Sequence, residues 1–251
     1  MPMLEVSGLV KRFLGVTAVD GVDLAIEAGE LVSLIGPNGS GKTTLFDCVT
    51  GYLGSDAGRV VFRGREVSGA APHRIARLGI GRTFQQVSVF GRLTALENLL
   101  VFLQQHQEEH LLARLLRTAG VRRLERQAVE RARALLDLVG LGARAHAPAG
   151  SLSYGQRKLL SFAAALMPDP DLLLLDEPAA AVNPTMINQM KDHILTLHRQ
   201  GKTVLLVEHN MDVVMDISRR IVVLDHGQKI AEGPPDVIRR DPKVIEAYFG
   251  R

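Results

Sequence analysis

Apolar residues in the first part of the chain fall into short runs whose spacing predicts strands. The runs are rich in β-branched residues and bounded by glycine or charged residues, which is typical of strands joined by turns. They are Leu4–Val10, Val22–Ile26 and Arg59–Phe62. A further apolar run, Glu30–Ile35, ends at Gly36 and is followed by a helical pattern from Lys42. This order predicts a strand, a loop and a helix.

The last part of the chain has apolar runs that are continuous instead of alternating. Parallel strands that are buried on both faces have this pattern. The runs are Asp171–Leu175, Thr203–Val207 and Ile221–Leu224. Because helical segments lie between the first two of them, the pattern predicts right-handed crossovers and a parallel sheet. Asp241 and Pro242 then open a final helix that Gly250 ends.

Between these parts the spacing becomes helical. Thr94–Leu103 is predicted as a helix, with Thr94 and Glu97 placed as in a capping box. A longer amphipathic stretch follows over Leu111–Val139, with leucines on one face. We interpret its arginines as a solvated helix face, and a membrane-surface role is the alternative. The leucines are Leu111, Leu112, Leu115 and Leu116, and the arginines are Arg114, Arg117, Arg122, Arg123 and Arg126.

Composition narrows the class of protein. The 251 residues are 46% hydrophobic, which is enough to bury the core of one large domain or of two lobes. The net charge of +3 permits an anionic partner, such as a nucleotide or lipid head groups, without indicating nucleic acid. Aromatic residues make up 4% and Trp is absent, which argues against a base-stacking surface. The single Cys48 excludes an intramolecular disulfide.

Neither a secretory signal nor a membrane span is expected. The first residues lack a basic region followed by an apolar stretch. The apolar run Leu159–Met167 is interrupted by Ser161 and stopped by Pro168, well short of the roughly 18 to 20 residues that a span needs. We therefore expect any membrane role to depend on a partner.

The loop from Gly36 to Thr44 fits the phosphate-binding pattern G-x-x-x-x-G-K-[ST]. Its glycines let successive N–H groups point at an anion, Lys42 can reach the β- and γ-phosphates, and Thr43 can place its hydroxyl on Mg²⁺. A glycine-rich turn with a chance lysine is the alternative, which the preceding strand and following helix disfavour. The candidate nucleotide ligands here are Gly36, Asn38, Gly39, Ser40, Gly41, Lys42, Thr43 and Thr44.

Two carboxylates follow the apolar run Leu172–Leu175 directly. They are Asp176 and Glu177, placed at the carboxyl end of a buried strand, where ligands of open α/β sheets bind. Asp176 would hold Mg²⁺, and Glu177 would orient and deprotonate the attacking water. Alone, the pair could simply end a strand in solvent, but together with the phosphate loop it predicts hydrolysis of ATP.

A third motif, Ser151–Gln156, precedes the acidic strand and opens the helical stretch Arg157–Leu166. An N-capped helix is the simple interpretation of this motif on its own. In this order and spacing, however, the chain from about Leu4 to Gly250 resembles the nucleotide-binding subunit of an ATP-binding cassette (ABC) transporter. The resemblance implies an α/β fold, a P-loop NTPase (RecA-like) core with an antiparallel β subdomain and a helical subdomain that carries the signature motif.

The resemblance also implies lobes and partners. Residues 1–251 would form a single ABC ATPase domain, with residues 1–87 and 168–251 as the catalytic lobe and residues 88–167 as the helical lobe. Two ATPase subunits, identical or one a shorter paralogue, would sandwich two ATP molecules. Two membrane-spanning permease subunits would dock near Gln85–Phe90, and an extracytoplasmic solute-binding protein would take part indirectly.

Individual roles are implied residue by residue. Phe13 would stack on adenine, although a core phenylalanine is the alternative. Gln85 would sense Mg²⁺ and water. His209 would contact the γ-phosphate, and Ala181–Asn183 falls at the dimer-contact loop. The implied catalytic residues are thus Glu177, His209 and Gln85, and the implied metal ligands are Thr43, Gln85 and Asp176. The signature residues that would reach the γ-phosphate held by the opposite subunit are Ser153, Gly155 and Gln156.

Two departures from the family pattern bear on these roles. Tyr154 stands where many members have glycine. Ala181 and Val182 stand where close relatives have Gly-Leu, and a positive φ at Ala181 would cost of order 1 kcal/mol because of its Cβ.

Within the family, the chain is most similar to the longer ATPase of high-affinity branched-chain amino-acid importers. That ATPase has an insert like Gln104–Arg126 and a tail like Ala231–Pro235 running to Ala247–Gly250. The resemblance implies a peripheral protein on the cytoplasmic face of the inner membrane, with ATP and Mg²⁺ as cofactors and no nucleic acid partner. The alternatives are another ABC importer, a lipid or lipopolysaccharide exporter, and a soluble ABC ATPase that acts on nucleic acid or ribosomes.

Overall fold

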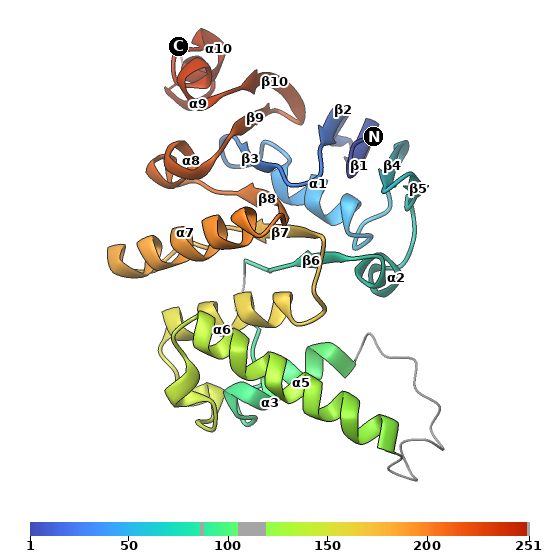
Figure 1. Cartoon of the computed structure of the whole chain (residues 1–251). Coiled ribbons are helices and arrows are strands. Elements are labelled where there is room, and N and C mark those ends of the chain that lie inside the picture. Colours follow the sequence, from blue (N-terminus) through green and yellow to red (C-terminus); the bar gives the residue numbers. More distant parts are fainter. Residues whose placement is uncertain (86–87, 105–118, 250–251) are drawn as a thin grey trace.

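The computed structural model describes residues 1–85, 88–104 and 119–249. Within these ranges the chain forms two sheets, with α1 between them and further helices beyond the larger sheet (Figure 1). The smaller sheet has the strand order β2-β1-β4-β5 and antiparallel pairing throughout, as predicted. Its strands are β1 (Leu4–Phe13), β2 (Val16–Ile26), β4 (Ala57–Phe62) and β5 (Arg65–Glu66).

The larger sheet has the strand order β10-β9-β3-β8-β7-β6. From β9 to β6 each strand runs parallel to its neighbour, and only β10 pairs antiparallel, at one edge. The strands are β3 (Leu31–Ile35), β6 (Ile80–Arg82), β7 (Leu172–Asp176), β8 (Thr203–Val207), β9 (Arg220–Asp225) and β10 (Gln228–Gly233). The predicted parallel sheet is confirmed, and the last residue of β7 is Asp176 itself.

Strand β7 shows why the predicted runs are continuously apolar. Leu173 and Leu175 pack into a core with residues of α6 and α7, on one face of the sheet. Leu172 and Leu174 pack into a second core with α1 and the smaller sheet, on the other face. Because both faces of β7 are covered, every one of its residues is buried and no alternation with polar residues arises.

The helices are α1 (Lys42–Val49), α2 (Pro72–Arg77), α3 (Ala95–Gln104), α5 (Ala119–Leu138), α6 (Tyr154–Leu166), α7 (Pro184–Arg199), α8 (Met211–Ile217), α9 (Pro235–Ile238) and α10 (Pro242–Phe249). Helix α1 packs on one face of the larger sheet and α6 and α7 pack on the other, while α3 and α5 pack on each other and on α6. The capping box predicted before α3 is present. Thr94 Oγ1 accepts from Glu97 N at 3.1 Å, and Glu97 Oε2 accepts from Thr94 N at 2.8 Å.

The predicted arginine-rich helix is described in its second part, as α5. Arg122, Arg123 and Arg126 are exposed there, as both the solvated face and the membrane-surface role require, and the choice between these two stays a prediction. Leu111 to Arg117, and with them Arg114 and most of the predicted insert, lie outside the described residues, as does Gly250.

Candidate active site

The predicted phosphate-loop, metal and catalytic residues lie where parallel strands end at one edge of the larger sheet. The phosphate loop follows β3, Gln85 follows β6, Glu177 follows β7, and His209 follows β8. Since β3, β8, β7 and β6 are consecutive and parallel, their carboxyl ends converge. Ligands of open α/β sheets bind at this edge.

Two glycines of the phosphate loop have no room for a side chain. A Cβ on Gly36, whose φ is 150°, would lie 2.0 Å from the carbonyl oxygen of Leu224. A Cβ on Gly41, whose φ is 100°, would lie 2.3 Å from the carbonyl oxygen of Ala18. The loop is therefore wedged between β9 and β2, and α1 begins directly after it at Lys42, as predicted.

The side chain of Lys42, at the beginning of α1, reaches back into this loop. Its Nζ donates to the carbonyl oxygens of Gly36 and Pro37, each at 2.9 Å, and to Ser40 Oγ at 3.2 Å. Burial lowers the pKa of Lys42, and the carboxylates of Glu177 and Asp176 oppose that shift. Of the other loop residues, Ser40 is buried, Thr44 is half-buried, and Asn38, Gly39 and Thr43 are exposed.

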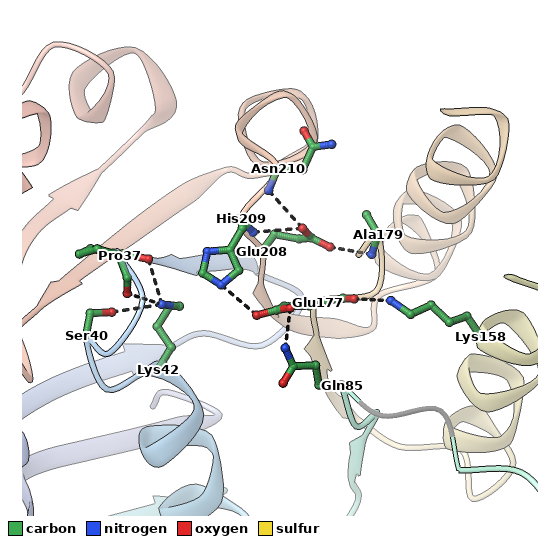
Figure 2. Close-up of polar contacts among 11 residues, drawn as sticks. Pro37, Ser40, Lys42, Gln85, Lys158, Glu177, Ala179, Glu208, His209 and Asn210 are labelled. Carbon is green, nitrogen blue, oxygen red and sulfur yellow. Dashed lines mark hydrogen bonds and ion pairs between the residues drawn. The ribbon is translucent and has the colours of Figure 1, made fainter. Parts of the chain in front are cut away.

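The three predicted catalytic side chains meet around Glu177. His209 Nε2 lies 2.8 Å from Glu177 Oε1, and Gln85 Nε2 donates to Glu177 Oε2 at 2.8 Å. Figure 2 shows the carboxylate of Glu177 between these two side chains, with Lys42 on the neighbouring loop. The backbone of Glu177 is left-handed, with φ 48°, and its N–H donates to Val207 O at 2.9 Å. Both carboxylate oxygens are thus oriented by partners from two other loops.

Asp176 has a free buried oxygen that suits a cation. Its Oδ2 lies 3.3 Å from an Arg82 nitrogen, whereas its Oδ1 is buried and accepts no hydrogen bond from the described residues. Burial raises the pKa of Asp176, and Arg82 opposes that shift. Mg²⁺ takes one or two carboxylates together with water and phosphate oxygens. Asp176 and the exposed Thr43 fit that ion, although the described ranges contain no group of three or more acidic, His or Cys side chains able to hold a metal by themselves.

The signature residues build the beginning of α6. Ser153 Oγ accepts from Gln156 N at 3.2 Å, and Gln156 Oε1 accepts from Ser153 N at 3.0 Å, so the pair forms a capping box. A Cβ on Gly155 would lie 2.1 Å from Met186 Sδ, so this end of α6 packs closely on α7. The N-capped helix that the sequence allows is therefore present, and the contact with a partner's nucleotide stays a prediction.

Phe13 lies at the end of β1, where the hairpin to β2 begins. Its side chain is 41% exposed, and Lys11 Nζ lies 5.4 Å from its ring centre. The core alternative for Phe13 is therefore wrong. Stacking on adenine stays a prediction, for which the ring is accessible.

Comparison with known proteins tests which protein family has this fold and site. Residues 19–180 match the family model described as ABC transporter. The chain belongs to the ABC transporter family. Residues 228–251 match a second family model, described as branched-chain amino acid ATP-binding cassette transporter, and they comprise β10, α9 and α10.

Relatives of this ABC transporter subunit match it over nearly its whole length. The high-affinity branched-chain amino acid transport ATP-binding protein BraF of Pseudomonas aeruginosa is 47% identical over 99% of this chain and 98% of its own. The corresponding LivG of Escherichia coli is 42% identical over the same shares. The ADP conformation of MJ1267, an ATP-binding cassette of an ABC transporter, superposes with a TM-score of 0.87, 36% identity and full coverage of both chains. The predicted fold is confirmed, and the chain is a nucleotide-binding ATPase.

Sequence reasoning missed three buried charged residues of this ATPase site. Arg82 donates to Asp47 Oδ1 at 2.6 Å and to Thr50 Oγ1 at 2.8 Å, besides its contact with Asp176. Lys158 on α6 and Glu208 at the end of β8 contact the loop after Glu177. The position of Glu208 could have been predicted from the sequence, because this residue directly follows an apolar strand that ends at the same sheet edge as Asp176.

The loop predicted to make the dimer contact contains the strained alanine that the sequence indicated. Ala181 has φ 57° and its side chain is exposed, so its Cβ is strained without gaining burial. We expect Ala181→Gly to raise the free energy of unfolding by about 1 kcal/mol, and the melting temperature by roughly 2–4 °C. Ala134→Gly is the matched control, because Ala134 is exposed inside α5, where glycine should destabilise by roughly 0.5–1 kcal/mol. If calorimetry shows that Ala181→Gly and Ala134→Gly destabilise the protein equally, the backbone at Ala181 is not strained.

Proposed function

We propose that this subunit hydrolyses magnesium-ATP to power the import of branched-chain amino acids. The observation that carries the hydrolytic part is the position of Glu177, which His209 and Gln85 orient at the same sheet edge as Lys42. The names of the relatives at 42% and 47% identity support the solute class.

Each residue of the site has a defined task in this proposal. The N–H groups of the loop from Gly36 to Gly41 and the beginning of α1 bind the phosphates, and Lys42 adds a fixed positive charge. A magnesium ion held by Thr43, Gln85 and Asp176 would neutralise phosphate charge. Glu177 accepts a proton from the attacking water, while His209 and Gln85 hold its carboxylate in place.

The site also needs a second chain. Ser153 and Tyr154 are exposed, so the beginning of α6 is open to another molecule. We propose that Ser153, Gly155 and Gln156 contact the γ-phosphate of a nucleotide held by a second ATPase subunit, identical or a shorter paralogue. Residues 88–167 act as the helical lobe in this arrangement and residues 1–87 and 168–251 as the catalytic lobe.

Membrane partners complete the proposed transporter. In the described part of the chain, no helix is both long and apolar enough to cross a bilayer. Two permease subunits would dock near Gln85 and Phe90, a region whose residues 86–87 lie outside the described ranges. An extracytoplasmic solute-binding protein would deliver the amino acid, and the subunit would lie peripherally on the cytoplasmic face of the inner membrane.

Uptake into proteoliposomes tests the proposal. Vesicles would carry the two permease subunits, this subunit and its partner ATPase, with ATP enclosed and the solute-binding protein outside. We expect labelled leucine to enter only with enclosed ATP, and unlabelled isoleucine and valine to compete where lysine does not. ATP-driven uptake of a different solute would overturn the substrate class. Co-purification with ribosomes or nucleic acid instead of permease subunits would overturn the proposal that this chain works in a transporter.

A further inference from the structure

The loop from Glu177 to Ala181 is held by a buried lysine that belongs to another element. Lys158 on α6 is 6% exposed. Its Nζ donates to the carbonyl oxygen of Glu177 at 2.8 Å, to that of Ala180 at 2.6 Å, and to that of Pro178 at 3.4 Å. Figure 2 shows Lys158 reaching the backbone of Glu177 from the side opposite Lys42. One ammonium group therefore binds three carbonyl groups of the loop that carries the proposed catalytic base.

Glu208 holds the same loop through an N–H group. Its Oε1 accepts from Ala179 N at 2.7 Å, and its Oε2 accepts from the N–H groups of His209 and Asn210 at 3.1 and 3.3 Å. Burial lowers the pKa of Lys158, and the carboxylates of Glu208 and Glu177 oppose that shift. The two buried charges thus stabilise each other and fix donors and acceptors of one short loop.

The backbone of Glu177 needs such support. Its φ of 48° is left-handed, which is unfavourable for a residue with a Cβ because the Cβ lies too close to the following carbonyl oxygen. Such strain persists only where the surroundings over-determine the conformation. The N–H of Glu177 is fixed by Val207 O and its carbonyl by Lys158, so the peptide groups on both sides of its Cα are held. The direction of its side chain, toward His209 and Gln85, follows from that backbone.

We propose that Lys158 is a positioning residue for Glu177, which fixes the left-handed backbone that directs the carboxylate. Because Lys158 belongs to α6, it also connects Ser153, at the beginning of that helix, to the hydrolytic site of the same chain. Contact between Ser153 and a partner's nucleotide would then be transmitted to Glu177. This inference rests on the proposed role of Glu177 as the general base.

Substitution of Lys158 tests this role. Lys158→Met keeps most of the apolar stem and removes the ammonium group. We expect kcat to fall roughly 10- to 100-fold, because a misplacement of about 1 Å can cost that much. The affinity for a fluorescent ATP analogue should change by no more than about threefold. Lys158→Arg, which keeps a charged donor, should recover part of kcat. Lys202→Met, which removes a half-buried lysine paired with Asp169 at 2.8 Å, is the matched control and should retain the wild-type rate.

A double-mutant cycle separates positioning from general damage. If Lys158 acts through Glu177, Lys158→Met should change the residual rate of Glu177→Gln by no more than about twofold. The same fold-loss in both backgrounds, or a wild-type rate for Lys158→Met, would overturn the proposal. Lys158→Gln, which keeps a neutral donor, replaces the methionine variant in the cycle if that variant does not fold. A wild-type hydrolysis rate for Glu177→Gln alone would overturn the assignment of Glu177 as the base, and with it the positioning role of Lys158. If Glu177→Gln hydrolyses ATP slowly and Lys158→Met hydrolyses it at the wild-type rate, only the role of Lys158 is overturned.

Discussion

Replacing Glu177 by glutamine should slow ATP hydrolysis by roughly 10²–10⁴-fold, the usual contribution of a general base. In the structure both carboxylate oxygens of Glu177 have partners, His209 Nε2 and Gln85 Nε2, each at 2.8 Å. Glutamine has the same shape, and its carbonyl oxygen can still accept from Gln85. The substitution therefore removes the proton acceptor and preserves the geometry around it.

Binding of ATP should survive this substitution and tighten, because one negative charge beside the triphosphate is lost. The variant should accumulate as an ATP-bound dimer, seen as a doubled mass in size-exclusion chromatography with light scattering. Glu125→Gln, on the exposed face of α5, is the matched control. A wild-type rate for Glu177→Gln would mean that the base is another residue.

Asp176→Asn should instead weaken the Mg²⁺-dependent part of nucleotide binding.

The parallel core of this ATPase could be predicted because its strands are covered on both faces. Each of the runs that became β7, β8 and β9 is apolar without interruption, and each forms a strand within one residue of the predicted bounds. The edge strands could not be found in this way. No residue of β10 is buried and three of its six are polar or charged and exposed, whereas β6 has only three residues, so neither gives an apolar run.

The order of motifs indicated most of the proposed site, because each motif follows a strand that ends at the same edge. Buried charges were harder to predict, since a lysine in an amphipathic helix ordinarily faces solvent. Lys158 nevertheless shares its helical spacing with the buried Phe162 and Ala165, a pattern that places it on the inner face of α6. Its partners, carbonyl groups of a loop nearly 20 residues further on, depend on tertiary packing and leave no local signal. The lobe boundaries at residues 87 and 167 stay a prediction.

Replacing Lys42 by alanine should lower the affinity for nucleotide roughly 10- to 150-fold, which corresponds to the loss of a charged hydrogen bond of about 1.5–3 kcal/mol. Lys42 Nζ is the cation that the phosphate loop itself encloses, 2.9 Å from the carbonyl oxygens of Gly36 and Pro37. Without it, the carboxylates of Asp176 and Glu177 would face the incoming phosphates with their charge less compensated.

Titration with a fluorescent ATP analogue measures the effect of losing Lys42, and two further variants make the result specific. Lys42→Met keeps the apolar stem in its buried position. An equal loss of affinity in Lys42→Ala and Lys42→Met therefore assigns the effect to the ammonium group and not to packing. Lys191→Ala removes a half-buried lysine of α7 that pairs with Asp216 and should bind like the wild type. Melting temperatures measured without nucleotide show whether the loop carbonyl groups lose stability when Lys42 no longer donates to them. Unchanged affinity in a folded Lys42→Ala variant would mean that the nucleotide binds elsewhere, because no phosphate could occupy this loop and be indifferent to the charge at its centre.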